Sequence, residues 1–167
     1  NGLPVFINAD HTYSVEKARV AIDAGVDSVI IDVVDKALEE NIKLTKEVVD
    51  YARSKNPEII VEGELGFIGK SSKVLDSLPE GVSEETQTNP EEAREFVRET
   101  SIDLFAPSVG NVHGMLKNAT EPRLHPDRVK EISDATGVPL VLHGASGNTE
   151  EDVRACIVAG MAIVHIN

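Results

Sequence analysis

The stretch VLHGASGNTEED, Val141–Asp152, carries the pattern that decides the fold class of this chain. An apolar run ends at His143, small residues follow, and Thr149 with Asp152 resembles a capping box at a helix start. Strand, tight turn and helix in this order make one βα unit. The small residues and the N–H groups of a helix start also suit a phosphate, although a plain tight turn has the same pattern.

The same alternation runs along the whole chain. Apolar runs predict strands at Pro4–Ile7, Ser28–Ile31, Glu58–Val61, Ile102–Pro107, Pro139–Leu142 and Met161–Ile166. Spacing and capping signals predict helices at Ser14–Ala24, Lys36–Lys55, Pro90–Thr100, His125–Thr136 and Thr149–Ala159. Such strands are typical of a parallel sheet that is covered on both faces. No GxGxxG motif follows the first strand, so the pattern favours a TIM (β/α)₈ barrel over a doubly wound sheet.

We expect residues 1–167 to form a single, partial TIM-barrel domain of about six consecutive βα units. Residues 68–89 are polar, rich in Ser, Glu and Gly, and follow an expected strand, which is typical of a long βα loop. Such a loop is either a mobile lid over a site or a surface insertion, and the sequence favours neither.

Composition limits the classes of partner and compartment. The net charge is −13, from 29 acidic and 16 basic residues, which argues against nucleic acid or an anionic membrane as the partner. No apolar run reaches the roughly 18 residues of a membrane span, and no signal peptide is visible at the start. The one cysteine, Cys156, permits no intramolecular disulfide, so we expect a reducing, cytoplasmic location and a buried thiol.

Histidines stand near the ends of three expected strands, and these are His11, His113 and His143. In a barrel the carboxyl ends of the strands surround one mouth, where imidazoles and carboxylates together suit a catalytic zinc site. A single histidine beside a strand is more often a packed or surface residue, and we interpret His125 in RLHPDR that way. The other polar residues at these ends are Asn8, Asp10, Asp32, Glu62, Glu64, Ser108, Asn111, Ser146, His165 and Asn167.

The motifs ADH, ID followed by EEN, EGELG, GNVHG and HGASG, in that order, resemble those of the class II, zinc-dependent ketose-bisphosphate aldolases. The main members of that family act on fructose or tagatose bisphosphate. The similarity runs through all the expected strands. It implies a TIM barrel that cleaves fructose 1,6-bisphosphate or tagatose 1,6-bisphosphate reversibly to dihydroxyacetone phosphate and glyceraldehyde 3-phosphate, as in glycolysis.

The resemblance implies a role for each matching residue. Asp10 is the acid that protonates the aldehyde oxygen as the carbon–carbon bond forms. The implied ligands of the catalytic zinc are His11, His113 and His143. A second or displaced cation is implied at Glu64 and Asp32. The implied sugar-phosphate site comprises Gly114, Gly144, Ala145, Ser146, His165 and Asn167, with Lys117 near an anion or monovalent-cation region.

The chain also departs from the family's pattern. HGASG replaces the usual HGGSG, His165 stands in place of an Asn, and GKSSK stands where an acidic pair helps to move the substrate proton. The six expected strands correspond to the family's barrel from its third strand into its last. Two alternatives therefore stay open: another metal-dependent sugar-phosphate aldolase, and a non-catalytic metal- or phosphate-binding barrel remnant. Apolar strand edges in an incomplete barrel also lead us to expect a homo-oligomer.

Overall fold

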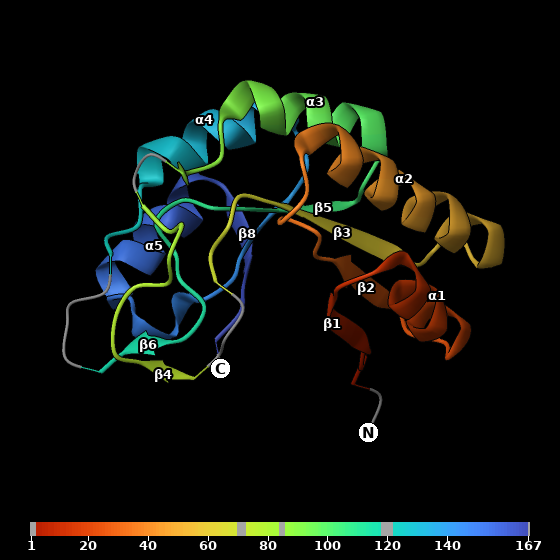
Figure 1. The fold of residues 1–167 in the computed structure, drawn as a ribbon, viewed down its shortest axis with the longest axis horizontal. Coiled ribbons are helices and arrows are strands. Elements are labelled where there is room, and N and C mark those ends of the chain that lie inside the picture. The colour runs from red at the N-terminus through yellow and green to blue at the C-terminus, as the bar shows by residue number, and fades with distance from the viewer. Residues whose placement is uncertain (1–2, 70–72, 84–85, 118–121, 167) are drawn as a thin grey trace. The chain divides into compact units, whose positions relative to one another are not determined.

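The structure is a computed structural model that describes residues 3–69, 73–83, 86–117 and 122–166 (Figure 1). The chain forms two compact units. The first unit comprises Asn1–Glu64 and Phe96–Leu104, and the second comprises Leu65–Glu95 and Phe105–Asn167. A single domain over residues 1–167 stays a prediction.

The first unit is built on three parallel strands in the order β1-β2-β3. These are β1 (Asn8–Thr12), β2 (Ser28–Ile31) and β3 (Ile60–Leu65). The helices between them, α1 (Val15–Asp23) and α2 (Leu38–Lys55), pack against each other (Figure 1). All three hydrophobic residues of β2, Val29, Ile30 and Ile31, are fully buried, as the apolar run predicts.

The first predicted strand is wrong. Residues Pro4–Ile7 do not form a strand and are exposed, with Val5 at 82% and Phe6 at 75%. The strand is the polar stretch Asn8–Thr12, whose pairing with β2 begins at Asn8↔Ser28. In the unit's strand order β1 is paired only on its β2 side, and along it exposed residues alternate with partly buried ones before the buried Thr12. A half-exposed strand tolerates the polar residues that an apolar-run criterion passes over.

Strand β3 is longer than predicted, and buried contacts fix it. It reaches Leu65 rather than Val61, so Glu62 and Glu64 lie inside the strand. The side chain of Asn41 on α2 is fully buried and donates to the carbonyl oxygen of Glu64 (3.0 Å). Gly63 leaves room for the Phe96 ring, because a Cβ there would lie 2.8 Å from it. The two glutamates share one face of the strand, since side chains alternate along it.

The second unit contains the parallel strands β5 (Leu104–Pro107), β7 (Leu140–Leu142) and β8 (Met161–Val164), in the order β5-β7-β8. Its helices α4 (Pro126–Thr136) and α5 (Glu150–Ala159) pack against each other. Helix α3 (Pro90–Thr100) begins in this unit. A small parallel pair, β4 (Val74–Leu75) with β6 (Met115–Leu116), lies outside the main strands and was not predicted (Figure 1).

Local signals in the second unit explain where its helices begin and end. The Thr149 side chain accepts a hydrogen bond from the Asp152 amide and caps α5, as the capping-box pattern predicts. Gly137 ends α4 in the left-handed conformation, with φ at 68°. The alternation of parallel strands and helices in both units confirms the α/β class.

The lone cysteine is a core residue. Cys156 on α5 is fully buried, and burial together with the charge of Asp152 raises the pKa of its thiol to about 11. A thiol with such a pKa carries little thiolate at neutral pH and is a poor nucleophile. Among the described residues, no helix has the length and apolar character needed to cross a membrane.

Candidate functional site

His11 lies in an irregular part of β1. Its φ is 48°, and the pairing with β2 shifts register between Ala9 and Thr12. A non-glycine residue in this conformation costs on the order of 1–3 kcal/mol, which surrounding contacts must offset. Thr12 supplies part of that support, since its hydroxyl donates to the carbonyl oxygen of Ile30 (2.5 Å). The bulge therefore holds the His11 imidazole in a fixed direction.

A cluster of buried carboxylates surrounds this imidazole within the first unit. Asp32 follows β2, and Glu62 and Glu64 belong to β3, with exposed fractions of 4%, 2% and 2%. The Nδ1 atom of His11 lies 3.0 Å from Oδ2 of Asp32 and 3.6 Å from Oε2 of Glu64. Ligand atoms of His11, Asp32 and Glu64 all lie within 4.8 Å of one another.

The hydrogen bond to Asp32 decides which nitrogen of His11 is left for a metal. A carboxylate only accepts, so Nδ1 of His11 carries the proton that it donates to Asp32. The neutral ring then has its lone pair on Nε2. Histidines that bind zinc generally donate their other N–H to a carboxylate or carbonyl in this way.

The charge balance of this cluster suits a cation. Burial alone lowers the pKa of His11, but the hydrogen bond to Asp32 and the charges of Asp10, Asp32 and Glu62 outweigh it and raise that pKa. Burial and neighbouring carboxylates also raise the pKa of Tyr13, whose ring stacks on His11 at 6.1 Å. Oδ1 of Asp32 is buried and has no hydrogen-bond partner among the described residues. Several carboxylates without a cation are costly to bury, so these residues fit a divalent ion.

The second unit brings three other imidazoles together. His143 follows the last residue of β7 and is only 1% exposed. Its ring centroid lies 5.7 Å from that of His113 and 4.4 Å from that of His165, both in edge-on arrangements. The backbone N–H of His165 donates to the carbonyl of Leu142 (2.9 Å), which keeps His165 beside the end of β7.

Backbone contacts hold His143 in place. The buried Asn111 side chain donates to the carbonyl oxygen of His143 (2.9 Å) and accepts from the Val109 N–H (2.8 Å). Gly144 follows with φ at 66°, and a Cβ there would lie 2.3 Å from the carbonyl oxygen of Val112. The sequence shows Asn111 as a polar residue after an expected strand, but no motif in it indicates the contact with His143.

The HGASG segment differs from a simple helix start. A short 3₁₀ turn, η2 (Ala145–Gly147), intervenes, and α5 begins only at Glu150. The first turn of α5 carries three carboxylates, which oppose a phosphate at that helix end. The predicted phosphate contacts of Gly144, Ala145 and Ser146 would therefore use the amides of the 3₁₀ turn. These contacts, and those of Gly114 and His165, stay predictions, and Asn167 lies outside the described residues.

Asp10, the predicted acid, is accessible. Its side chain is 58% exposed, and its Oδ1 lies 3.8 Å from Nε2 of His11. Glutamates of the loop 68–89 are candidates to replace the acidic pair that the family has. Glu80 is exposed, whereas Glu84 and Glu85 lie outside the described residues. Sequence reasoning missed Tyr13, although its spacing of two residues from His11 was a signal that it could lie beside that ring.

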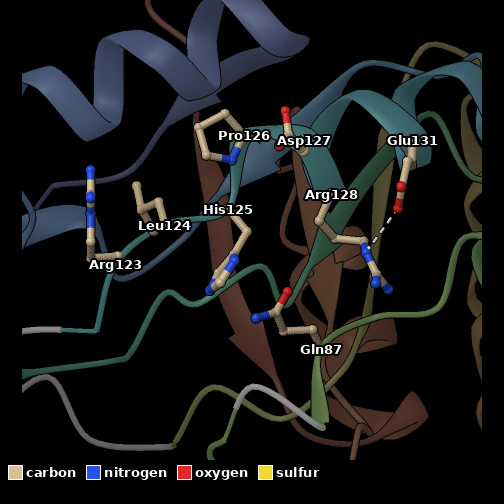
Figure 2. A pocket seen from close by; sticks show the side chains of 8 residues that line it. All are labelled: Gln87, Arg123, Leu124, His125, Pro126, Asp127, Arg128 and Glu131. Carbon is tan, nitrogen blue, oxygen red and sulfur yellow. Dashed lines mark ion pairs between the residues drawn. The ribbon is translucent and has the colours of Figure 1, made fainter.

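A separate pocket of about 420 Å³ lies at the start of α4 (Figure 2). Its arginines already have partners: Arg123 pairs with Asp152 at 3.1 Å, and Arg128 pairs with Glu131 at 3.0 Å. His125 directly precedes α4, and its backbone N–H donates to the carbonyl of Val109. The pocket includes none of the predicted site residues, because its lining is Gln87, Arg123, Leu124, His125, Pro126, Asp127, Arg128 and Glu131.

Comparison with known proteins relates these units to one family. Curated fructose-bisphosphate aldolases from Geobacillus stearothermophilus and Staphylococcus aureus (strain Mu50) are each 41% identical over 165 residues, which is 99% of this chain. The structure of the YdjI aldolase from Escherichia coli K12 is 37% identical over 99% of the chain, with a TM-score of 0.81. A structure described as a fructose-1,6-bisphosphate aldolase from Coccidioides immitis is 35% identical over 99% of the chain, with a TM-score of 0.83.

The chain spans about half the length of these relatives: 54% of the two curated proteins, 54% of the YdjI chain and 57% of the Coccidioides chain. The fold is thus the predicted partial TIM barrel, with parallel βα units matching about half of a barrel aldolase. The family model for class II fructose-bisphosphate aldolases matches residues 1–167, and the chain belongs to that family.

Proposed function

We propose that this chain forms the zinc-binding part of a class II aldolase that cleaves a ketose bisphosphate reversibly. The products would be dihydroxyacetone phosphate and glyceraldehyde 3-phosphate, and the substrate would be fructose 1,6-bisphosphate or tagatose 1,6-bisphosphate. The observation that carries this proposal is the family match over all 167 residues. The hydrogen bonds at Nδ1 of His11 and His113 support it, because they leave Nε2 of each ring for a metal.

In this proposal His11, His113 and His143 would hold zinc, and Asp32 and Glu64 would hold a second or displaced divalent cation. Bound zinc supplies Lewis-acid polarisation of the substrate carbonyl and offsets the negative charge that develops beside it. The amides of Gly144, Ala145 and Ser146, with Gly114, His165 and Asn167, would bind and orient the phosphate of the three-carbon fragment. Fixing that fragment would make the condensation of the two products effectively unimolecular.

Asp10 would move the proton at the other carbon of the scissile bond. In cleavage its carboxylate takes the hydroxyl proton as the carbon–carbon bond breaks and the aldehyde forms. In the reverse direction the same carboxyl group returns that proton to the aldehyde oxygen. The exposure of Asp10 supports this role, since the group must reach a substrate and exchange its proton with solvent.

Zinc analysis tests the proposal directly. We expect about one tightly held zinc per chain by elemental analysis after dialysis, and loss of that zinc in His143→Ala. His125→Ala is the matched control and should keep its zinc, because His125 lies outside the proposed ligand set. Absence of zinc from the unsubstituted protein, or equal zinc in the His143→Ala protein, would contradict the proposal.

A second candidate is a related metal-dependent aldolase with another sugar phosphate as substrate. Two observations favour keeping it: GKSSK stands where the family has an acidic pair, and one similar structure is named only as an aldolase. A panel of ketose mono- and bisphosphates separates the candidates. Turnover of fructose 1,6-bisphosphate far above every other sugar would exclude the second one.

We also propose a cytoplasmic homo-oligomer. Large apolar side chains are exposed in both units, including Phe6 at 75% in the first and Val158 at 88% on α5 in the second. Such surfaces favour association. Light scattering should therefore give a mass above the 18.0 kDa of one chain, and Val158→Lys should lower it. A monomer at every concentration would refute self-association.

A further inference from the structure

The segment after β3 holds the backbone and side chain of His113 within the second unit. The N–H of His113 donates to the carbonyl oxygen of Ile68 (2.8 Å). Nδ1 of the same residue lies 3.0 Å from the carbonyl oxygen of Gly69. Both Ile68 and Gly69 are buried, so water does not compete strongly for these carbonyls. Two consecutive carbonyls therefore fix the position and the ring of one histidine.

Residues 73–75 contact the residues that follow His113. Strand β4 pairs in parallel with β6, with Val74 opposite Met115 and Leu75 opposite Leu116 (Figure 1). The N–H of Met115 donates to the carbonyl of Lys73 at 3.3 Å. Residues 68–69 and 73–75 thus contact residues 113–117 at successive points. Such pairing restrains the His113 loop more than an isolated hydrogen bond does.

We propose that residues 68–69 and 73–75 form a strap that positions His113, with the Gly69 carbonyl oxygen deciding which ring nitrogen of His113 carries the proton. A carbonyl oxygen only accepts, so the hydrogen bond requires the proton of the neutral ring to lie on Nδ1. Nε2 then carries the lone pair and is the nitrogen offered to a metal. This inference rests on the proposed function for its metal, but the tautomer itself does not depend on a metal.

Glycine is required at position 69 of the strap. Gly69 has φ at 92°, and a Cβ there would lie 3.0 Å from Cγ of Pro79. Alanine at this position would be strained in its backbone and crowded by Pro79, and both effects would displace the carbonyl. Gly81 in the same loop has φ at 90°, but a Cβ there would meet only the Phe67 ring at 3.6 Å, an ordinary contact. Gly81→Ala is therefore a control for backbone strain without the contact to His113.

The first test is the zinc affinity of three proteins, measured by competition with a chelator. We expect Gly69→Ala to bind zinc about 10–100-fold more weakly than the unsubstituted protein, as for other groups that orient a metal ligand. Gly81→Ala should bind zinc as tightly as the unsubstituted protein. An equal loss of zinc affinity in both variants, or no loss in Gly69→Ala, would contradict the proposal that the strap positions His113.

The second test does not require any variant to fold or any zinc to bind. Long-range ¹H–¹⁵N correlation spectra of the metal-free, unsubstituted protein at pH 8 report the tautomer of each histidine. We expect neutral His113 to carry its ring proton on Nδ1. A ring proton on Nε2 instead would contradict the proposed role of the strap. If zinc does not bind but the Nδ1 proton is found, the proposed function fails and the strap stands.

Discussion

Asp10→Ala is expected to lower the rate of aldol cleavage by about 10²–10⁴-fold, the usual contribution of a positioned acid or base. Asp10 is exposed, and its Oδ1 lies 3.8 Å from Nε2 of His11. It therefore lies beside a proposed zinc ligand but is not one of the three proposed ligands itself. Alanine cannot exchange the hydroxyl proton. Zinc content should stay unchanged, because His11, His113 and His143 are retained. Turnover and elemental analysis on the same sample measure both quantities.

The control for this change is Asp50→Ala. Asp50 is another exposed carboxylate of the first unit, 67% accessible and paired with Lys46 on α2. Its removal changes the net charge by the same amount and should leave turnover unchanged. If the chain is instead a non-catalytic barrel remnant, the unsubstituted protein has no aldolase activity to lose. Asp10→Ala should then leave its ligand affinity unchanged. Loss of zinc together with turnover would show that Asp10 acts through the metal site rather than on the substrate.

Much of the fold could be predicted because its signals are local. Apolar runs locate β2 and β7, and caps such as Ser14, Thr149 and Gly137 locate helix ends. The first strand could not be found this way, because it is mostly polar and only Thr12 at its end is buried. The extension of β3 was missed for a related reason. Glu62 and Glu64 look like loop residues in the sequence, and the pairing with β2, which includes Ile30 opposite Glu62, shows that the strand continues through them.

The candidate site was predictable in its residue types but not in its supports. Histidines after apolar runs and carboxylates near strand ends are visible in sequence. The bulge that gives His11 a φ of 48° depends on how β1 pairs with β2, which no short motif records. The contact of the Gly69 carbonyl with His113 joins residues 44 positions apart through a backbone atom. Every residue has a carbonyl, so this contact leaves no signature beyond the glycine itself.

Gly144→Ala is expected to destabilise the protein through both backbone strain and overlap with neighbouring backbone atoms. Gly144 has φ at 66°, and an alanine in this left-handed conformation is less stable than a glycine by about 1 kcal/mol. The added Cβ would also lie 2.3 Å from the carbonyl oxygen and 2.6 Å from the carbonyl carbon of Val112. These are backbone atoms, so no side-chain rotation relieves the overlap. Overpacking of this kind adds roughly 1–3 kcal/mol to the cost.

Gly137→Ala separates the two contributions. Gly137 has nearly the same φ, 68°, but a Cβ there meets no atom within 4 Å. Both variants lose the same unfolded-state freedom, so the difference in their free energies of unfolding isolates the overlap at Gly144. Denaturant titration should place Gly137→Ala near 1 kcal/mol and Gly144→Ala about 1–3 kcal/mol beyond it. Because Val112 directly precedes His113, relief of that overlap would move a proposed zinc ligand, so zinc affinity should fall in Gly144→Ala alone. Equal destabilisation of the two variants, with zinc affinity unchanged in both, would show that the segments carrying His113 and His143 are not held together by this close approach.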